Sequence, residues 1–336
     1  YGMVNGIEGM LQDHTIDLGE SLSEEELELL KLTPAAYLGS CRYKLPESLT
    51  DAFYETIFEK FRRMEIGYFL YIGGNDSMDT VSKLSRYAAH HGSDIRFIGI
   101  PKTIDNDLAA TDHTPGYGSA AKYIGSITKE VIRDGLVYDQ QNVTILEIMG
   151  RNAGWLTGAA ALAKCEDCEG PDMIFLPEVT FDVDEFMKKV AELHKKKKSV
   201  VVAVSEGVKT ADGRYVCELT DGIDFVDAFG HKQLTGTARF LAEKINREVG
   251  CKTRAIEFNS LQRCASHIVS RVDITEAYQV GGAAVKEAFE GETGKMIILK
   301  RVSDDPYICV TDIYDVHKVA NVEKKVQGTP IKVISK

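Results

Sequence analysis

Three charged residues crowd the segment "KTIDND" at 102–107, and their chemical types suit phosphoryl transfer. Lys102 supplies a positive charge, whereas Asp105 and Asp107 supply carboxylates that can accept a proton or bind Mg²⁺. The segment follows the apolar run 95–100, which has the pattern of a buried parallel strand. A loop with an Asx turn is the alternative interpretation.

A pair of glycines, Gly73–Gly74, separates the apolar run 68–72 from the amphipathic segment 76–91. This pattern predicts a strand that turns directly into a helix. The first turn of such a helix has free N–H groups at the positive end of the helix dipole, so it favours an anion such as phosphate. A plain turn in which Asp76 or Ser77 caps the helix is the alternative, and the glycine pair alone does not decide between them.

Two further predicted strand ends carry polar residues. After the run 143–148, Gly150 lets the backbone turn and Arg151 offers a planar guanidinium for phosphate. After the run 199–204, Glu206 follows within "SEG". Because the carboxyl ends of parallel strands form the ligand-binding edge of a sheet, these loops predict one site at a single rim.

Short β-rich runs alternate with helical patterns, which predicts an α/β fold with a parallel sheet covered on both faces. The predicted strands are 68–72, 95–100, 143–148, 173–176, 199–204 and 253–258. The predicted helices are 76–91, 184–198, 230–249 and 273–290. Another helix is expected after Ser23, which forms a capping box with Glu26.

Composition argues against several classes of protein. The net charge of the 336 residues is −11, so nucleic acid is not expected as a partner. No run of about 18 uncharged apolar residues occurs, so a membrane partner is not expected either. Seven cysteines at irregular spacing indicate a reducing, cytoplasmic setting. For Cys165-x-x-Cys168 we predict a plain loop or helix end, with a metal or redox site as the alternative.

Eight segments, in this order, resemble the phosphofructokinase family: "YLGSCR" (37–42), "GGNDS" (73–77), "PKTIDND" (101–107), "TPGYGSA" (114–120), "MGRNAG" (149–154), "LPE" (176–178), "SEG" (205–207) and "TRAIEFNSLQR" (253–263). The resemblance implies two three-layer αβα lobes with mainly parallel sheets. It implies a phosphoryl-donor domain of residues 1–118 plus about 268–312, a fructose-6-phosphate-binding domain of residues 119–267, and a C-terminal segment of residues 313–336. The family's Gly-rich first loop has no counterpart, so we expect a chain truncated at the N-terminus and weak activity from it alone.

The family transfers a phosphoryl group to the 1-hydroxyl of fructose 6-phosphate. With Asp76 and Lys102, the chain resembles the branch of the family that uses diphosphate as donor. The ATP-dependent branch resembles the chain in the neighbouring residues but has glycine at both of these positions. A carboxylate at Asp76 would repel the α-phosphate of ATP. The resemblance therefore implies a near-reversible reaction of glycolysis or gluconeogenesis. An ATP-dependent 6-phosphofructokinase and a non-catalytic regulatory subunit that binds sugar phosphate are the alternatives.

The resemblance also implies a role for each matching residue. The implied catalytic residues are Asp105 as base, Lys102 and Arg151 as stabilisers of the transferring group, and Asp76. The implied donor-binding residues are Gly73, Gly74, Asn75 and Arg42. The implied substrate-binding residues are Thr103, Ile104, Asp107, Met149, Gly150, Glu206, Arg254 and Arg263.

Asn75 stands where many relatives carry a metal-binding aspartate, so the resemblance assigns Mg²⁺ to Asp76 and Asp107. In the family, one of the two arginines that grip the 6-phosphate comes from a neighbouring subunit. Arg254 therefore implies a homodimer or homotetramer with shared active sites. For each implied arginine, a surface salt bridge is the alternative interpretation.

Overall fold

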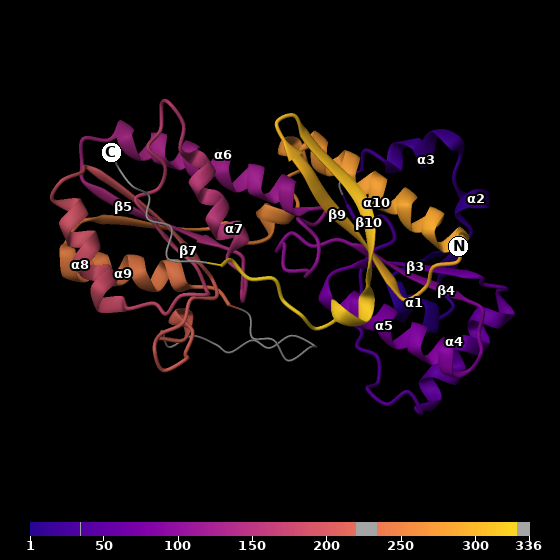
Figure 1. Cartoon of the computed structure of the whole chain (residues 1–336). Coiled ribbons are helices and arrows are strands. Elements are labelled where there is room, and N and C mark those ends of the chain that lie inside the picture. Colours follow the sequence, from indigo (N-terminus) through magenta and orange to yellow (C-terminus); the bar gives the residue numbers. More distant parts are fainter. Residues whose placement is uncertain (34, 220–233, 328–336) are drawn as a thin grey trace. The chain divides into compact units, whose positions relative to one another are not determined.

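The computed structural model describes residues 1–33, 35–219 and 234–327. These residues form two compact units, each with its own four-stranded sheet (Figure 1). The first unit comprises Tyr1–Thr103, Leu108–Pro115 and Arg271–Val322. The second comprises Ile104–Asp107, Gly116–Ser270 and the chain from Glu323 onward.

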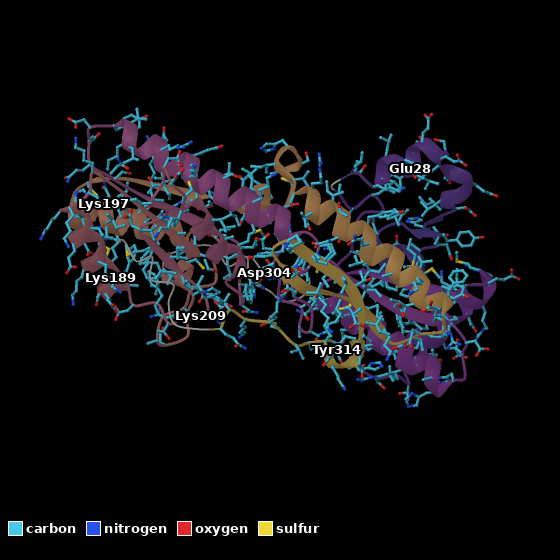
Figure 2. The ribbon with its side chains drawn as sticks, turned by 45° about the horizontal axis from the view of Figure 1, so that its top comes forward. Glu28, Lys189, Lys197, Lys209, Asp304 and Tyr314 are labelled. Carbon is cyan, nitrogen blue, oxygen red and sulfur yellow. The ribbon has the colours of Figure 1, made fainter. Side chains whose placement is uncertain are left out.

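The sheet of the first unit has the strand order β10-β9-β4-β3. Its strands are β3 (Tyr68–Gly73), β4 (Arg96–Pro101), β9 (Lys295–Asp304) and β10 (Tyr307–Asp315). The first three run parallel, whereas β9 and β10 form an antiparallel hairpin. Figure 2 labels Asp304 and Tyr314 toward opposite ends of this hairpin.

Helices cover both faces of this first sheet. Phe69 and Phe97 enter the core that α4 (Ala52–Arg63) and α5 (Asn75–His90) share, whereas the next residues along each strand enter a second core with α10 (Arg271–Phe289). This alternation follows from the two-residue period of a strand. Short elements precede them: β1 (Gly2–Met3), α1 (Gly6–Leu11), β2 (Thr15–Ile16), α2 (Leu18–Ser21) and α3 (Glu24–Leu30).

The sheet of the second unit is wholly parallel, with the order β6-β7-β5-β8. Its strands are β5 (Asn142–Ile148), β6 (Met173–Phe175), β7 (Ser199–Ser205) and β8 (Lys252–Glu257). One face packs on α6 (Tyr117–Val137), α7 (Trp155–Gly158) and the 3₁₀ helix Ala159–Ala163. The other face packs on α8 (Val183–His194) and α9 (Thr237–Val249).

The predicted α/β class with two three-layer lobes is confirmed, and all six predicted strands are present. The capping box of Ser23 and Glu26 is also confirmed. The predicted helix 184–198 ends earlier, at His194. The predicted start of the helix 230–249 lies partly outside the described residues, and α9 begins at Thr237. Sequence reasoning missed α4, α6 and the β9–β10 hairpin.

The expectation of a single sheet rim is wrong. The strands before the Gly73 and Lys102 loops belong to the first sheet, whereas the strands before the Gly150 and Glu206 loops belong to the second. The physical reason is that an alternating pattern predicts strands but not which strands pair. The donor and acceptor roles of the two predicted domains stay predictions.

None of the described helices has the length and apolar character that a bilayer crossing requires. All seven cysteines have free thiols. Cys165 and Cys168 exchange backbone hydrogen bonds of 2.9 and 3.2 Å across a tight turn, so the predicted plain loop is confirmed.

Candidate functional site

The glycine pair lies at the predicted junction of strand and helix. Strand β3 ends at Gly73, Gly74 is the N-cap, and α5 begins at Asn75. A Cβ on Gly73 would lie 2.0 Å from the Ser77 hydroxyl oxygen, so packing requires glycine there. Gly74 differs, because its φ is −93° and a Cβ would find only ordinary contacts within the described structure. Packing therefore does not require glycine at position 74.

The Lys102 segment lies beside this glycine pair in the same unit. The Lys102 amide donates to the Gly73 carbonyl at 2.9 Å, which continues the parallel pairing of β3 and β4 past its last residue pair. Thr103 donates its amide to the Pro115 carbonyl at 3.2 Å, and the Thr114 hydroxyl donates to the Thr103 carbonyl at 2.7 Å. The side chains of Asp76 and Lys102 are exposed. The first unit thus brings Gly73, Gly74, Lys102 and Thr103 together.

In the second unit, the loops after β5 and β7 interlock. Glu206 donates its amide to the Ile148 carbonyl at 2.9 Å, and its carboxyl oxygen Oε1 lies 3.4 Å from the Gly150 amide. The Ser205 hydroxyl donates to the Gly150 carbonyl. A Cβ on Gly207 would lie 2.0 Å from the Arg151 carbonyl oxygen. The close approach of the two loops therefore requires glycine at 207.

Gly150 needs glycine for a different reason. Its φ is +138°, a value that side-chain-bearing residues rarely adopt, and a Cβ there would lie 2.6 Å from the Ala153 carbonyl oxygen. This turn sends the backbone from the end of β5 into the loop that carries Arg151. The sequence prediction of a turn at Gly150 is confirmed.

The pKa of Glu206 depends on the charged groups near these loops. Burial, together with the negative charges of Asp105 and Glu147, raises the pKa of Glu206 to about 7. The Gly150 amide and the positive charge of Arg151 act in the opposite direction. Asp105, Arg151 and Glu206 therefore interact electrostatically within the second unit.

The segment Ile104–Asp107 is anchored in this second unit. Ile104 packs against the same apolar cluster as Met149. Lys324 donates its amide to the Asp107 carbonyl at 2.7 Å and its ammonium group to the Asn106 side chain at 3.0 Å. These contacts hold the backbone on both sides of Asp105 and place Asp105, Asp107, Met149, Gly150, Arg151 and Glu206 in one unit.

The other three predicted arginines lie outside the loops that follow β3, β4, β5 and β7. Arg42 is exposed in a loop of the first unit, and Arg263 is exposed at the end of the 3₁₀ helix Asn259–Arg263. Arg254 pairs with Thr144 in register and donates to Asp134 at 2.7 Å. Since β5 runs four residues further, from Thr144 to Ile148, Arg254 lies about 13 Å from the start of the Met149 loop along the strand.

The similarity of the chain to known proteins shows its family. The family model described as "Phosphofructokinase" matches residues 1–288 of the chain. The chain belongs to the phosphofructokinase family. Proteins named "Pyrophosphate--fructose 6-phosphate 1-phosphotransferase" include relatives from Halomonas elongata, 41% identical over 327 residues, and Xanthomonas campestris pv. campestris, 42% identical over 324 residues. Each alignment covers 96% of this chain and 77% of the relative.

A solved structure of the family has the same fold. The pyrophosphate-dependent phosphofructokinase from Nitrosospira multiformis matches with a TM-score of 0.85 and 36% sequence identity. The match covers 97% of this chain and 76% of that chain. The phosphofructokinase architecture therefore extends over both units.

Sequence reasoning missed two buried polar residues of the second unit, one that bonds the Met149 loop and one that bonds the start of α9. Gln262 is 3% exposed, and its carbonyl oxygen accepts the Met149 amide at 3.1 Å. Glu147 is 4% exposed and accepts the amides of Gly236 and Ala238 at the start of α9, at 3.3 and 2.7 Å. Glu147 could have been recognised from the sequence, because it is the only charged residue within the apolar run 143–148.

Glu147 adds to an unusual concentration of carboxyl groups near Met149. Burial raises the pKa of Glu147 to about 7. Glu147, Glu206 and Glu257 line one small cavity of about 10 Å³. The space is no larger than a single water molecule, and two of the carboxyl groups that line it, those of Glu147 and Glu206, have a raised pKa of about 7.

Proposed function

We propose that the chain is a diphosphate–fructose-6-phosphate 1-phosphotransferase. It transfers a phosphoryl group reversibly from diphosphate to the 1-hydroxyl of fructose 6-phosphate and yields fructose 1,6-bisphosphate and phosphate. The observation that carries this proposal is the bond between the Lys102 amide and the Gly73 carbonyl, which holds Lys102 beside the loop that bears Asp76. The names of relatives at 41 and 42% identity support the same reaction.

Selection of a short donor rests on Asp76. Its exposed carboxylate lies in the first turn of α5, two residues after Gly74. Diphosphate ends where the α-phosphate of ATP would continue, so the negative charge of Asp76 disfavours the longer donor. Gly73, Gly74 and Asn75 offer the donor the N-terminal amides of α5, and Arg42 adds a positive charge.

Acceptor activation rests on Asp105. The carboxylate of Asp105 takes the proton from the 1-hydroxyl as the sugar oxygen bonds to phosphorus and the bridging P–O bond of diphosphate breaks. Lys102 and Arg151 stabilise the negative charge of the transferring group. Lys102 and Asp105 are three residues apart, so their Cα atoms lie within about 11 Å whatever the loop conformation.

Recognition of the sugar phosphate falls to the loops of the second unit. Met149 and Gly150 lie against the sugar, Glu206 binds its hydroxyl groups, and Arg263 binds the 6-phosphate. Thr103, Ile104 and Asp107 complete the set of substrate-binding residues. Arg254 serves the 6-phosphate of a partner subunit, which makes the protein a homodimer or homotetramer with shared sites. Its place along β8, away from the Met149 loop of its own chain, supports this assignment.

A divalent cation, Mg²⁺, belongs to this proposal. The donor set suits a hard ion, because Asp76 presents an exposed carboxylate and Asp107 supplies a second one. When bound, Mg²⁺ neutralises charge on the phosphate oxygens. Asp76 and Asp107 would hold it, and Lys102 supplies the remaining positive charge. The reaction is placed in the cytoplasm, in glycolysis or gluconeogenesis.

A coupled assay tests the proposal. Formation of fructose 1,6-bisphosphate is followed with diphosphate or ATP as the donor, in the presence of Mg²⁺. We expect turnover with diphosphate and none with ATP. Turnover with ATP alone would establish the ATP-dependent alternative, and binding of fructose 6-phosphate without turnover would establish a regulatory subunit.

A further inference from the structure

A partly buried cluster of charged and polar side chains lies in the first unit, outside the residues assigned above. It surrounds His113, whose Nε2 lies 2.6 Å from a carboxylate oxygen of Glu276 on α10. The Nδ1 atom lies 2.8 Å from a carboxylate oxygen of Asp112. Tyr307 on β10 donates its hydroxyl to the second oxygen of Glu276 at 2.5 Å. Arg301 on β9 forms an ion pair with Asp112 at 2.9 Å.

The loop that carries His113 also holds the backbone of the donor site. Thr114, which follows His113, is fully buried and donates its hydroxyl to the Thr103 carbonyl at 2.7 Å. The next residue, Pro115, accepts the Thr103 amide at 3.2 Å. The Lys102 amide in turn donates to the Gly73 carbonyl. A displacement at His113 is therefore passed on through two residues to Thr103.

We infer that His113 positions the Lys102–Thr103 segment by clasping the loop Leu108–Pro115 to helix α10. This inference rests on the proposed function in so far as it concerns catalysis. His113 contacts no predicted substrate group, so it is a positioning residue.

The clasp acts on one half of the loop only. Asp112 donates its amide to the Leu299 carbonyl at 2.8 Å, and the Thr111 hydroxyl accepts the Leu299 amide at 2.9 Å. These bonds fix the first half of the loop to β9 without His113. The second half, which bonds Thr103, is held by two contacts: the Thr111 hydroxyl donates to the His113 carbonyl at 2.8 Å, and the His113 imidazole contacts Glu276. Loss of the imidazole should loosen Thr114 and Pro115 and leave the fold intact.

The clasp works best when the imidazole is positively charged, because both ring nitrogens face carboxylate oxygens. The groups that surround it are Asp112 on the loop, Arg301 on β9, Glu276 on α10, and Tyr307 and Cys309 on β10. Burial opposes the charged form, but the hydrogen bonds to Glu276 and Asp112 prevail and raise the pKa of His113 above its ordinary value. The clasp therefore weakens as pH rises through that pKa.

A metal ion is the competing explanation of the cluster. Ligand atoms of His113, Glu276 and Cys309 lie within 4.8 Å of one another, a spacing that a zinc ion could bridge. The metal content of the purified protein separates the two explanations. Stoichiometric zinc that is lost in Cys309→Ser would overturn the clasp.

The positioning role is tested with His113→Gln, and His90→Gln on the exposed end of α5 is the matched control. We expect kcat to fall about tenfold in His113→Gln, with a small change in KM for fructose 6-phosphate, because misplaced groups reduce turnover more than binding. In the wild type, kcat should decline at alkaline pH as His113 loses its proton. This decline should be absent in His113→Gln. A variant with the kcat and pH profile of the wild type would contradict the inference.

Hydrogen–deuterium exchange separates this inference from the proposed reaction. At one fixed pH, the Thr103 amide should exchange faster in His113→Gln than in the wild type, whereas the Asp112 amide should not change. This result is expected even if diphosphate is not the donor. If His113→Gln does not fold, Glu276→Gln serves as the second variant. Unchanged exchange at Thr103 in the folded variant would refute the clasp.

Discussion

The loops of the two units hold their functional side chains in contrasting ways. In the first unit, backbone hydrogen bonds fix the loops while Asp76 and Lys102 point into solvent. In the second unit, Glu206 is half-buried, its pKa is raised by burial, and the loop beside it approaches closely at Gly207. If the proposed function holds, the donor is selected by exposed charges and the acceptor is received by closely packed loops.

The largest effect is expected from the acceptor side, at Asp105. Asp105→Ser should lower kcat by about 10²–10⁴-fold, the usual contribution of a general base. The coupled assay at saturating substrate measures the loss. Asp184→Ser, in the first turn of α8, is the matched control and should keep the wild-type kcat. Full activity of Asp105→Ser would remove Asp105 from the mechanism.

Gly207→Ala tests whether close packing holds the loops after β5 and β7 in place. The added methyl group would lie 2.0 Å from the Arg151 carbonyl oxygen, so one loop must move. We expect the free energy of unfolding to fall by about 1–3 kcal/mol. The only tryptophan, Trp155, lies in the second unit, so its fluorescence during urea unfolding measures the change there.

Gly281→Ala in α10 is the control for this substitution, because a Cβ there meets open space. Alanine favours a helix over glycine by about 0.5–1 kcal/mol, so this variant should be slightly more stable by circular dichroism. Equal stability of Gly207→Ala and the wild type would show that the two loops do not depend on their close approach.

Asp76→Gly tests charge selection on the donor side. Removal of the carboxylate should raise kcat/KM for ATP by about tenfold or more, which corresponds to about 1.4 kcal/mol of relieved repulsion. Asp76→Asn is the companion variant, because it removes the charge and keeps the size. If neither variant gains activity with ATP, exclusion of ATP does not depend on Asp76.

A further effect is expected in the pH dependence of stability. The carboxyl group of Glu206 has a pKa of 4.5 in the unfolded chain and about 7 in the folded protein. The folded state therefore binds more protons between these two pH values. The free energy of unfolding should therefore fall as pH rises through this window. Glu206→Gln should flatten that fall, as measured by urea unfolding at pH 5 and pH 8. An identical slope in the variant would contradict the raised pKa.

The sequence predicted the strands and their functional loops because buried parallel strands are continuous apolar runs with polar residues at their ends. Gly73, Gly150 and Glu206 were found in this way. The hydrophobic pattern alone did not show which strands pair, because the pattern of β3 and that of β5 are alike. The two lobes were predicted from the resemblance to the family. The roles of Gln262 and Lys324 were also invisible, since their partners lie far away in the sequence.

The most direct test of donor selection places both donors in one sample. ³¹P NMR follows the chain with fructose 6-phosphate, Mg²⁺ and equal concentrations of diphosphate and ATP. We predict that the diphosphate signal falls as signals of phosphate and fructose 1,6-bisphosphate grow, while the ATP signals stay constant. Loss of the γ-phosphate signal of ATP with diphosphate unchanged would contradict the account.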